Sequence, residues 1–262
     1  MHLLTNSLRR SKKLKIIEVK KINKYFGDLE VLSNISLCVD KNQFVSILGP
    51  SGSGKSTLFN IISGLLLPDD GHVFINGKDF TGKTGKVSYM QQKDLLLPWK
   101  TILDNVSIPL FLKKTPLPKA RKIASNYFNS FGLEGFEEMY PSQLSGGMRQ
   151  RAALLRTFLF SSEIMILDEP FGALDAITRN EMHLWLMNIY KKYKPTVLFI
   201  THDIDEAILL SDKIYLFTNR PATIKKIIDV DIPRPRTQRV FTSPEFQALK
   251  GKIINLLQTE TQ

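Results

Sequence analysis

The chain has 262 residues, of which 43% are hydrophobic and 23% charged, so it is large and apolar enough for a packed globular fold without disulfide bonds. Its single cysteine, Cys38, excludes an internal disulfide and a cysteine-based metal cluster, and we expect it to be a small core residue in a reducing compartment. The net charge of +11 suits contact with nucleic acid, anionic lipid or nucleotide phosphates, and composition does not choose among them.

The chain starts with a basic stretch that carries five basic residues between Arg9 and Lys15. We expect residues 1–15 to be a solvated tail, with contact to an anionic surface as the alternative. Its charges follow a short apolar stretch instead of preceding it, which is the reverse of a secretory signal. No apolar run approaches the length of about 18 residues that a membrane-spanning helix needs. We therefore expect a cytosolic chain.

Short strands are predicted between residues 16 and 48, because β-branched and polar residues alternate and turn residues separate the segments. The segment 57–66 then places Leu58, Ile61, Ile62 and Leu65 at the spacing of a helix with one buried face. A strand therefore passes through a glycine-rich loop into a helix. Another strand is predicted at 72–77.

Helical spacing replaces the strand pattern from about residue 100 to 162, which predicts a helical insertion. Strands return at 164–168 and 196–201 as continuous apolar runs, as the two covered faces of a parallel sheet require. Residues 243–258 predict a closing helix. An amphipathic stripe between the two strands is interpreted as core packing; it comprises Met182, Trp185, Leu186, Ile189 and Tyr190.

The glycine-rich loop, GPSGSGKS at residues 49–56, satisfies G-x-x-x-x-G-K-[ST] between a predicted strand and a predicted helix. Glycines let consecutive backbone N–H groups point at phosphate oxygens, and the helix dipole adds positive potential there. We predict that Lys55 reaches the β- and γ-phosphates and that the Ser56 hydroxyl ligates Mg²⁺. A flexible linker is disfavoured because buried apolar elements frame the loop. The predicted nucleotide-binding residues of this loop are Gly49, Pro50, Ser51, Gly52, Ser53, Gly54, Lys55, Ser56 and Thr57.

Three further residues follow predicted buried strands, at the edge of the sheet where ligands gather. Asp168 is expected to hold Mg²⁺ through a water, and Glu169 to polarise the water that attacks the γ-phosphate. Two solvated acids at a strand end are the alternative. His202 ends the second strand and could donate to the γ-phosphate, although a lone histidine is more often structural. The other histidines are interpreted as structural; they are His2, His72 and His183.

With these motifs the chain resembles the ATP-binding subunit of ABC transporters, and the resemblance extends from Tyr25 to beyond His202. It implies an α/β fold with a P-loop NTPase (RecA-like) core, an antiparallel β subdomain and a helical insertion subdomain. The ATP-binding domain would span residues 16–262, with the helical subdomain at about 100–162 and the last helix at about 243–258.

The resemblance also implies roles for single residues. Tyr25 in NKYFG would stack on adenine. Gln92 would bind Mg²⁺, take part in catalysis and contact the membrane partner, with Gln91 as the alternative by one position. The signature loop would comprise Leu144, Ser145, Gly146, Gly147 and Met148. The loop that passes between subunits would comprise Ala173, Leu174 and Asp175.

The signature loop gives a role to the second glycine-rich stretch, LSGGMRQR at 144–151. In the family two subunits pack head to tail, and the signature loop of one closes on the γ-phosphate held by the other. The resemblance thus implies an ATP-dependent homodimer. The chain departs from the family at Met148, where glutamine is usual, and at Gly172, where serine is usual. A methionine cannot form the hydrogen bonds of an amide.

The stretches LLPWKTILDNV at 96–106 and DIPRPR at 231–236 are similar to importer ATPases for nitrate, sulfonates, taurine and thiamine precursors. This resemblance implies a Mg²⁺-dependent ATPase on the cytoplasmic side of the membrane, bound to a permease, with an extracytoplasmic solute-binding protein in the complex. Leu96, Leu97 and Trp99 would seat a permease helix if exposed, or pack in the core.

Two other functions stay open from the sequence. One is a non-transport ABC ATPase that acts on nucleic acid or ribosomes, which the positive charge makes worth considering. Nucleic acid is nevertheless not expected as a partner, because the chain carries one cassette and no long coiled-coil insertion. The other is a nucleotide-binding regulator without hydrolysis, against which Glu169 and His202 both argue.

Overall fold

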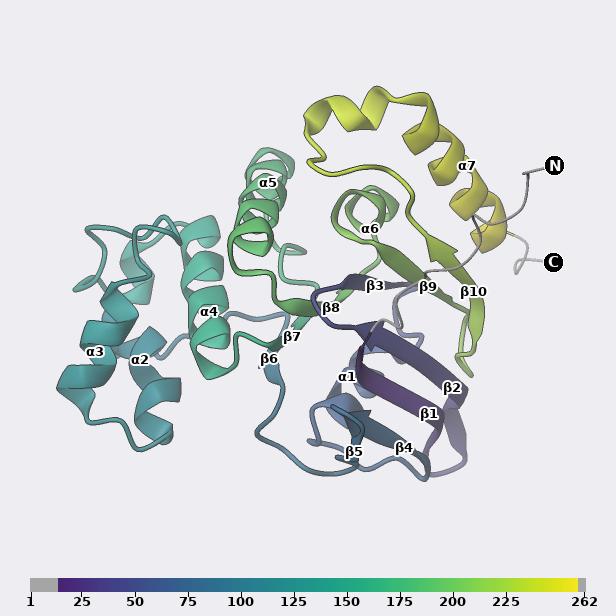
Figure 1. The fold of residues 1–262 in the computed structure, drawn as a ribbon, viewed down its shortest axis with the longest axis horizontal. Coiled ribbons are helices and arrows are strands. Elements are labelled where there is room, and N and C mark those ends of the chain that lie inside the picture. Colours follow the sequence, from purple (N-terminus) through teal and green to yellow (C-terminus); the bar gives the residue numbers. More distant parts are fainter. Residues whose placement is uncertain (1–13, 259–262) are drawn as a thin grey trace, which may run out of the picture.

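The computed structural model of the protein describes residues 14–258, which form two β-sheets with helices between and beside them (Figure 1). Residues 1–13 of the predicted basic tail lie outside this part of the chain.

The larger sheet has six strands in the order β10-β9-β3-β8-β7-β6. The strands from β9 to β6 are parallel, and β10 pairs antiparallel with β9 at one edge. Because parallel strands end at the same edge, the segments that follow β3, β7 and β8 meet there. The strands are β3 (Phe44–Leu48), β6 (Ser88–Met90), β7 (Ile164–Asp168), β8 (Thr196–Thr201), β9 (Lys213–Phe217) and β10 (Ile224–Asp229).

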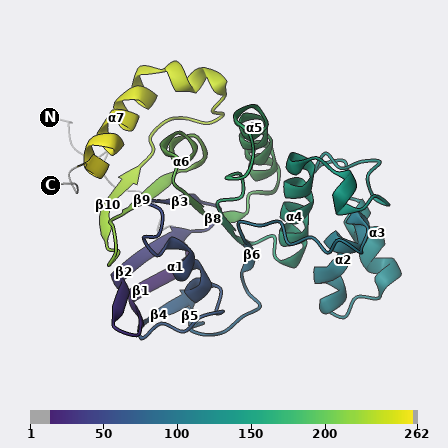
Figure 2. The ribbon, with the colours of Figure 1, turned by 180° about the vertical axis from the view of Figure 1, so that it is seen from behind.

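The smaller sheet is antiparallel, with four strands in the order β2-β1-β4-β5. Helix α1 (Lys55–Ile62) lies between the two sheets, and one hydrophobic cluster joins apolar side chains from both sheets and from α1 (Figure 2). This packing fixes the smaller sheet against α1. The strands are β1 (Lys15–Phe26), β2 (Leu29–Asp40), β4 (Asp70–Ile75) and β5 (Lys78–Asp79).

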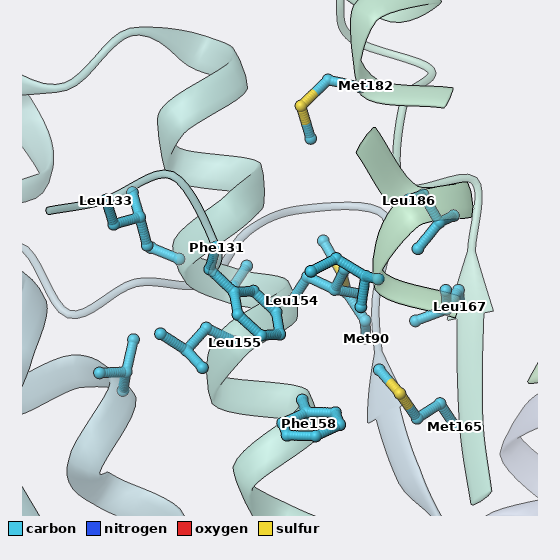
Figure 3. Close-up of a cluster of buried hydrophobic side chains, with 14 of the residues drawn as sticks. Met90, Phe131, Leu133, Leu154, Leu155, Phe158, Met165, Leu167, Met182 and Leu186 are labelled. Carbon is cyan, nitrogen blue, oxygen red and sulfur yellow. The ribbon is translucent and has the colours of Figure 1, made fainter. Parts of the chain in front are cut away.

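A group of helices extends from the β6–β7 side of the larger sheet (Figure 1). It comprises α2 (Ile102–Leu112), α3 (Leu117–Ser125), the 3₁₀ turn Pro141–Gln143 and α4 (Gly146–Phe160). Helix α4 connects the group to the sheet: its Leu154, Leu155 and Phe158 face Met90 of β6 and Met165 of β7 (Figure 3).

Three helices cover the remaining surface of the larger sheet, at the side away from the smaller sheet (Figure 1). They are α5 (Ala176–Tyr193), α6 (Ile204–Leu210) and α7 (Pro244–Gln258), with the 3₁₀ turn Gln238–Thr242 before α7. Helices α6 and α7 share a third hydrophobic cluster with β9 and β10. The buried residues of the predicted stripe on α5 pack in the hydrophobic cluster that also contains Leu154, Leu155 and Phe158 of α4, as the sequence predicted.

The predicted α/β class, with a parallel core sheet, an antiparallel sheet and a helical insertion, is confirmed. Two details of the prediction are wrong. Leu65 is not on the buried face of α1, because the helix ends at Ile62 and Leu65 is exposed. Gly64 forces this end: its φ is +80°, and a Cβ there would lie 2.1 Å from the Lys83 backbone oxygen. Cys38 is half-buried instead of a core residue.

Candidate active site

The phosphate-binding loop predicted at residues 49–56 runs from the end of β3 into α1, beside the last residue of β9. A Cβ at Gly49 would lie 2.9 Å from Phe217 Cβ, and a Cβ at Gly54 would lie 2.8 Å from Val31 Cγ1. Gly54 also has a φ of +104°, so a larger residue would be both crowded and strained. The loop can therefore follow this path only with glycine at these positions.

Lys55 begins α1 inside this loop and is 5% exposed. Its ammonium group donates to the carbonyls of Gly49 and Pro50, at 2.9 and 2.6 Å. Burial lowers the pKa of Lys55, while Glu169 and Asp168 act in the opposite direction. The loop thus curls around a buried cation.

Asp168 is the last residue of β7 and is 6% exposed. It accepts hydrogen bonds from Ser56 and from the hydroxyl of Tyr89, the latter at 3.2 Å. Burial raises the pKa of Asp168, and these two hydrogen bonds oppose the rise. Tyr89, on β6, was not predicted from the sequence.

Glu169 follows Asp168 with a φ of +43°, which is strained for a residue with a side chain. Its backbone N–H donates to Ile200 of β8 at 3.1 Å, which holds this conformation. Its Oε2 lies 3.2 Å from His202 Nδ1 and accepts a hydrogen bond from Gln92 Nε2 at 3.5 Å. The three residues predicted to be catalytic therefore meet at one carboxylate.

A cavity of about 550 Å³ opens over the phosphate-binding loop and the two acids. Its lining comprises Phe26, Leu29, Val31, Ser51, Gly52, Gly54, Lys55, Ser56, Thr57, Gln92, Asp168, Glu169 and Arg220. This volume is in the range of small-molecule sites. The sequence analysis did not single out the four members from β1, β2 and the turn after β9, which are Phe26, Leu29, Val31 and Arg220.

The aromatic side chain in this cavity is Phe26, not the predicted Tyr25. Neighbouring residues of a strand point to opposite faces. Tyr25 accordingly points elsewhere, and its hydroxyl donates to Glu30 Oε1 at 3.3 Å.

The predicted signature loop lies apart from this cavity, because none of residues 144–148 lines it. Ser145 is exposed and caps α4 by accepting a hydrogen bond from the Met148 N–H at 3.3 Å. Gly147 is buried, and a Cβ there would lie 3.0 Å from Thr178 Cγ2 on α5.

The predicted inter-subunit loop leads into α5, which places it beside the start of α4. Asp175 caps α5 by accepting from the N–H groups of Ile177 and Thr178, and Leu174 is buried while Ala173 is exposed. These residues also stand outside the lining of the cavity.

A series of hydrogen-bonded, buried polar side chains ends at Thr201, the residue before His202. His183 Nε2 on α5 lies 2.7 Å from Glu206 Oε1 on α6. Thr201 donates to Glu206 Oε2 at 2.5 Å and accepts from the Asp203 N–H at 2.9 Å. His183 Nδ1 is buried without a hydrogen-bond partner among residues 14–258, so we infer that the proton is on Nε2, where it can be donated to Glu206. His183 is structural, as predicted.

The oxygen atoms of Asp168 and its neighbour Ser56 suit a nucleotide bound together with Mg²⁺. Ser56 and Asp168 offer oxygen ligands, and in the described part of the chain no cluster of three or more His, Cys, Asp or Glu residues could hold a metal ion. Mg²⁺ usually takes few protein ligands and completes its shell with phosphate oxygens and water. The hydroxyl of Ser53 in the loop is also buried without a partner among residues 14–258.

This fold and site define the class of phosphate-loop ATPases. The family model described as "ABC transporter" matches residues 32–172, and the chain belongs to this family as an ATP-binding domain. None of the helices formed by residues 14–258 has the length and apolar character needed to cross a bilayer.

Two relatives and one solved structure show how the chain compares with known proteins. It is 44% identical to a formylaminopyrimidine import ATP-binding protein of Halalkalibacterium halodurans, over 87% of this chain and 89% of that protein. It is 39% identical to an aliphatic sulfonates import ATP-binding protein of Bacillus cereus, over 91% and 94% of the two chains. The dimeric structure of a bacterial ABC transporter cassette matches with a TM-score of 0.72 and 31% identity, over 83% of this chain and 100% of that chain.

Proposed function

We propose that this chain is the Mg²⁺-dependent ATPase subunit of an importer, and that it works as an ATP-dependent homodimer beneath a permease on the cytoplasmic side of the membrane. One observation carries the proposal: the Glu169 carboxylate lies between Gln92 and His202 at the edge of the phosphate-loop cavity. A nucleotide-binding regulator has no need of this arrangement.

Nucleotide binding uses the lining of the cavity. Phe26 stacks on adenine in place of Tyr25, and the N–H groups of residues 49–57 bind phosphate oxygens together with the Lys55 ammonium. The residues that hold Mg²⁺ are Ser56, Asp168 and Gln92; the ion supplies charge neutralisation at the phosphates when bound.

Hydrolysis depends on the placement of Glu169. Its carboxylate accepts a proton from the attacking water, and the hydrogen bond from its backbone N–H to Ile200 fixes its position relative to the loop. His202 lies 3.2 Å away, orients the carboxylate, and donates to the γ-phosphate.

A second copy of the chain completes each site. Residues 144–148 do not line the cavity of their own chain, and Ser145 stands exposed at the start of α4, where backbone N–H groups and the helix dipole favour an anion. Residues 144–148 of one copy thus bind the γ-phosphate held by the other. Residues 173–175 pass between the two copies.

The permease binds near Gln92, on the segment before α2. Leu96 is buried there, whereas Trp99 is 71% exposed. Asn105 is fully buried and bonds to the backbone of Leu97, Lys100 and Thr101, so the loop that presents Trp99 is held in one shape. An exposed aromatic side chain on a rigid loop suits a helix of a membrane partner.

Import is favoured over action on nucleic acid, because the two relatives described above are named as import ATP-binding proteins. An extracytoplasmic solute-binding protein is the expected third component.

The test is Glu169→Gln in the full chain. We expect release of phosphate from Mg-ATP to fall by about 100-fold or more, since a general base is lost, while Mg-ATP binding is kept. Size-exclusion chromatography should then show an ATP-dependent dimer. Normal turnover, or a monomer at saturating Mg-ATP, contradicts the proposal. Turnover that rises with RNA or DNA but not with a co-reconstituted permease contradicts import.

A further inference from the structure

Arg220 stands on the turn between β9 and β10, outside every motif of the sequence. Thr218 donates its N–H to the Thr223 carbonyl at 3.1 Å, and its hydroxyl accepts from the Thr223 N–H at 2.8 Å. Ala222 is fully buried, and its backbone bonds to Val31 and Ser33 of β2, each at 2.9 Å. The turn is therefore fixed to the strand that forms one wall of the nucleotide cavity.

The turn carries the Arg220 side chain over the phosphate-binding loop. Gly49 packs against Phe217 at the end of β9, so the chain leaves β9 directly beside the loop. Arg220 Nη2 lies 3.4 Å from the position that a Cβ on Gly52 would take. Arg220 also lines the same cavity as Lys55 and Asp168.

The charge of Arg220 is uncompensated within the described chain. None of the ion pairs and side-chain hydrogen bonds found for residues 14–258 engages its guanidinium group. Lys55, the other cation of the cavity, already donates to two loop carbonyls and lies near two acids. A planar guanidinium with five N–H donors matches the oxygens of a phosphate chain.

We propose that Arg220 is a further phosphate ligand of the bound nucleotide, which reaches the cavity from the β9–β10 turn. This inference rests on the proposed ATP-binding function. It assigns a direct contact with the substrate to the β9–β10 turn, which no sequence motif marks.

The experiment measures Mg-ADP binding to the full chain by isothermal titration calorimetry, because the diphosphate avoids turnover. Arg220→Gln should weaken binding by about tenfold, as expected for a lost charge-assisted hydrogen bond, and Arg220→Lys should recover part of the affinity. Arg220 is exposed, so the thermal midpoint of both variants should match that of the wild type.

The matched control is Arg239→Gln, which removes an equal charge from an exposed site in the 3₁₀ turn Gln238–Thr242, outside the cavity lining. It should leave Mg-ADP affinity unchanged. The inference is overturned if Arg220→Gln binds within twofold of the wild type, or if Arg239→Gln weakens binding equally, since that shows a long-range field instead of a contact.

Lys55→Ala separates this inference from the proposed function. If Lys55→Ala loses Mg-ADP while Arg220→Gln keeps it, only the role of Arg220 fails. If Lys55→Ala also binds normally, the nucleotide site itself is wrong and both proposals fail.

Discussion

Tyr25 and Phe26 are neighbours at the end of β1, and only Phe26 faces the nucleotide cavity. Strand alternation alone could not choose between them from the sequence, because the register of β1 against β2 shifts between Val19 and Ile22 and twice more before Tyr25. Each shift exchanges the two faces of the strand. The motif indicated an aromatic residue here, and only the folded strand shows which one.

Replacement of the two aromatic residues tests this assignment. Phe26→Ala should weaken Mg-ADP binding by about tenfold, because a stacking contact with a base contributes about 1–3 kcal/mol. Tyr25→Ala, the matched control, should change the dissociation constant by no more than about twofold on the same reasoning. Titration calorimetry measures both, and a larger effect at Tyr25 would restore the sequence-based assignment.

His183 illustrates how a residue without a motif can support the site. It is 4% exposed and contacts Glu206, whose other oxygen accepts from Thr201 next to His202. The sequence analysis interpreted His183 as structural, with nothing to indicate that α6 would bring a carboxylate to it.

We expect His183→Ala to lower the free energy of unfolding by about 3 kcal/mol, because Glu206 loses its buried partner. His183→Gln, which keeps an N–H donor, should lose about 1 kcal/mol. Urea unfolding monitored by circular dichroism measures both. Equal losses in the two variants would mean that packing, not the hydrogen bond to Glu206, accounts for the effect.

At the scale of elements, the stretch DIPRPR at 231–236 has a structural explanation. Arg236 is 3% exposed and donates to the carbonyls of Ile208, Leu209 and Ser211 at the carboxyl end of α6. Arg234 donates to Leu210 and pairs with Asp212 at 2.9 Å. Two arginines thus satisfy the carbonyls that a helix end leaves free. The short helix after His202 depends on a segment more than one element away.

Replacement of Arg236 by an uncharged residue tests the importance of this cap. Burial lowers the pKa of Arg236 to about 10, so the side chain stays charged at neutral pH. Arg236→Met should lower the free energy of unfolding by about 3 kcal/mol, because several buried carbonyls lose their donors. Urea unfolding gives the value, with the exposed Arg239→Met as the control, expected within about 0.5 kcal/mol of the wild type. An equal, small change in both variants would show that water replaces the arginine without cost.

The elements themselves were predicted unevenly. The apolar runs of β3, β7 and β8 and the stripe on α5 are strong patterns, and the structure has these elements. Strands β6, β9 and β10 were not predicted: β6 has three residues, and β10 alternates weakly because it lies at the sheet edge. Since β9 and β10 carry Arg220 on their connecting turn, this gap also hid a cavity residue.

At the scale of the whole molecule, the cavity is assembled from five separate segments of the chain. The sequence located three of them, because parallel strands bring the loops after β3 and β7 to one edge and because the family resemblance identified Gln92. The other two segments, the β1–β2 wall and the β9–β10 turn, become part of the cavity through tertiary packing. Such packing leaves no local signal in the sequence. The predicted signature loop lies outside the cavity.

A mixture of two defective chains tests the arrangement of the dimer. Lys55→Ala and Ser145→Arg should each be inactive alone. In a mixed dimer one site combines an intact phosphate-binding loop with an intact signature loop, so an equal mixture should regain about a quarter of the wild-type ATPase rate if copies pair at random and sites act independently. Phosphate release measures the rate. A mixture no more active than its components contradicts the two-chain site.

The position of β3 in the larger sheet determines when the chain can fold during its synthesis. This strand is buried at every position, yet both of its neighbours, β8 and β9, are synthesised long after it. A nascent chain that has just emerged with its phosphate-binding loop therefore exposes an apolar strand before either of its partner strands has been made. The chain can bind a nucleotide only near the end of translation, when the β9–β10 turn completes the cavity.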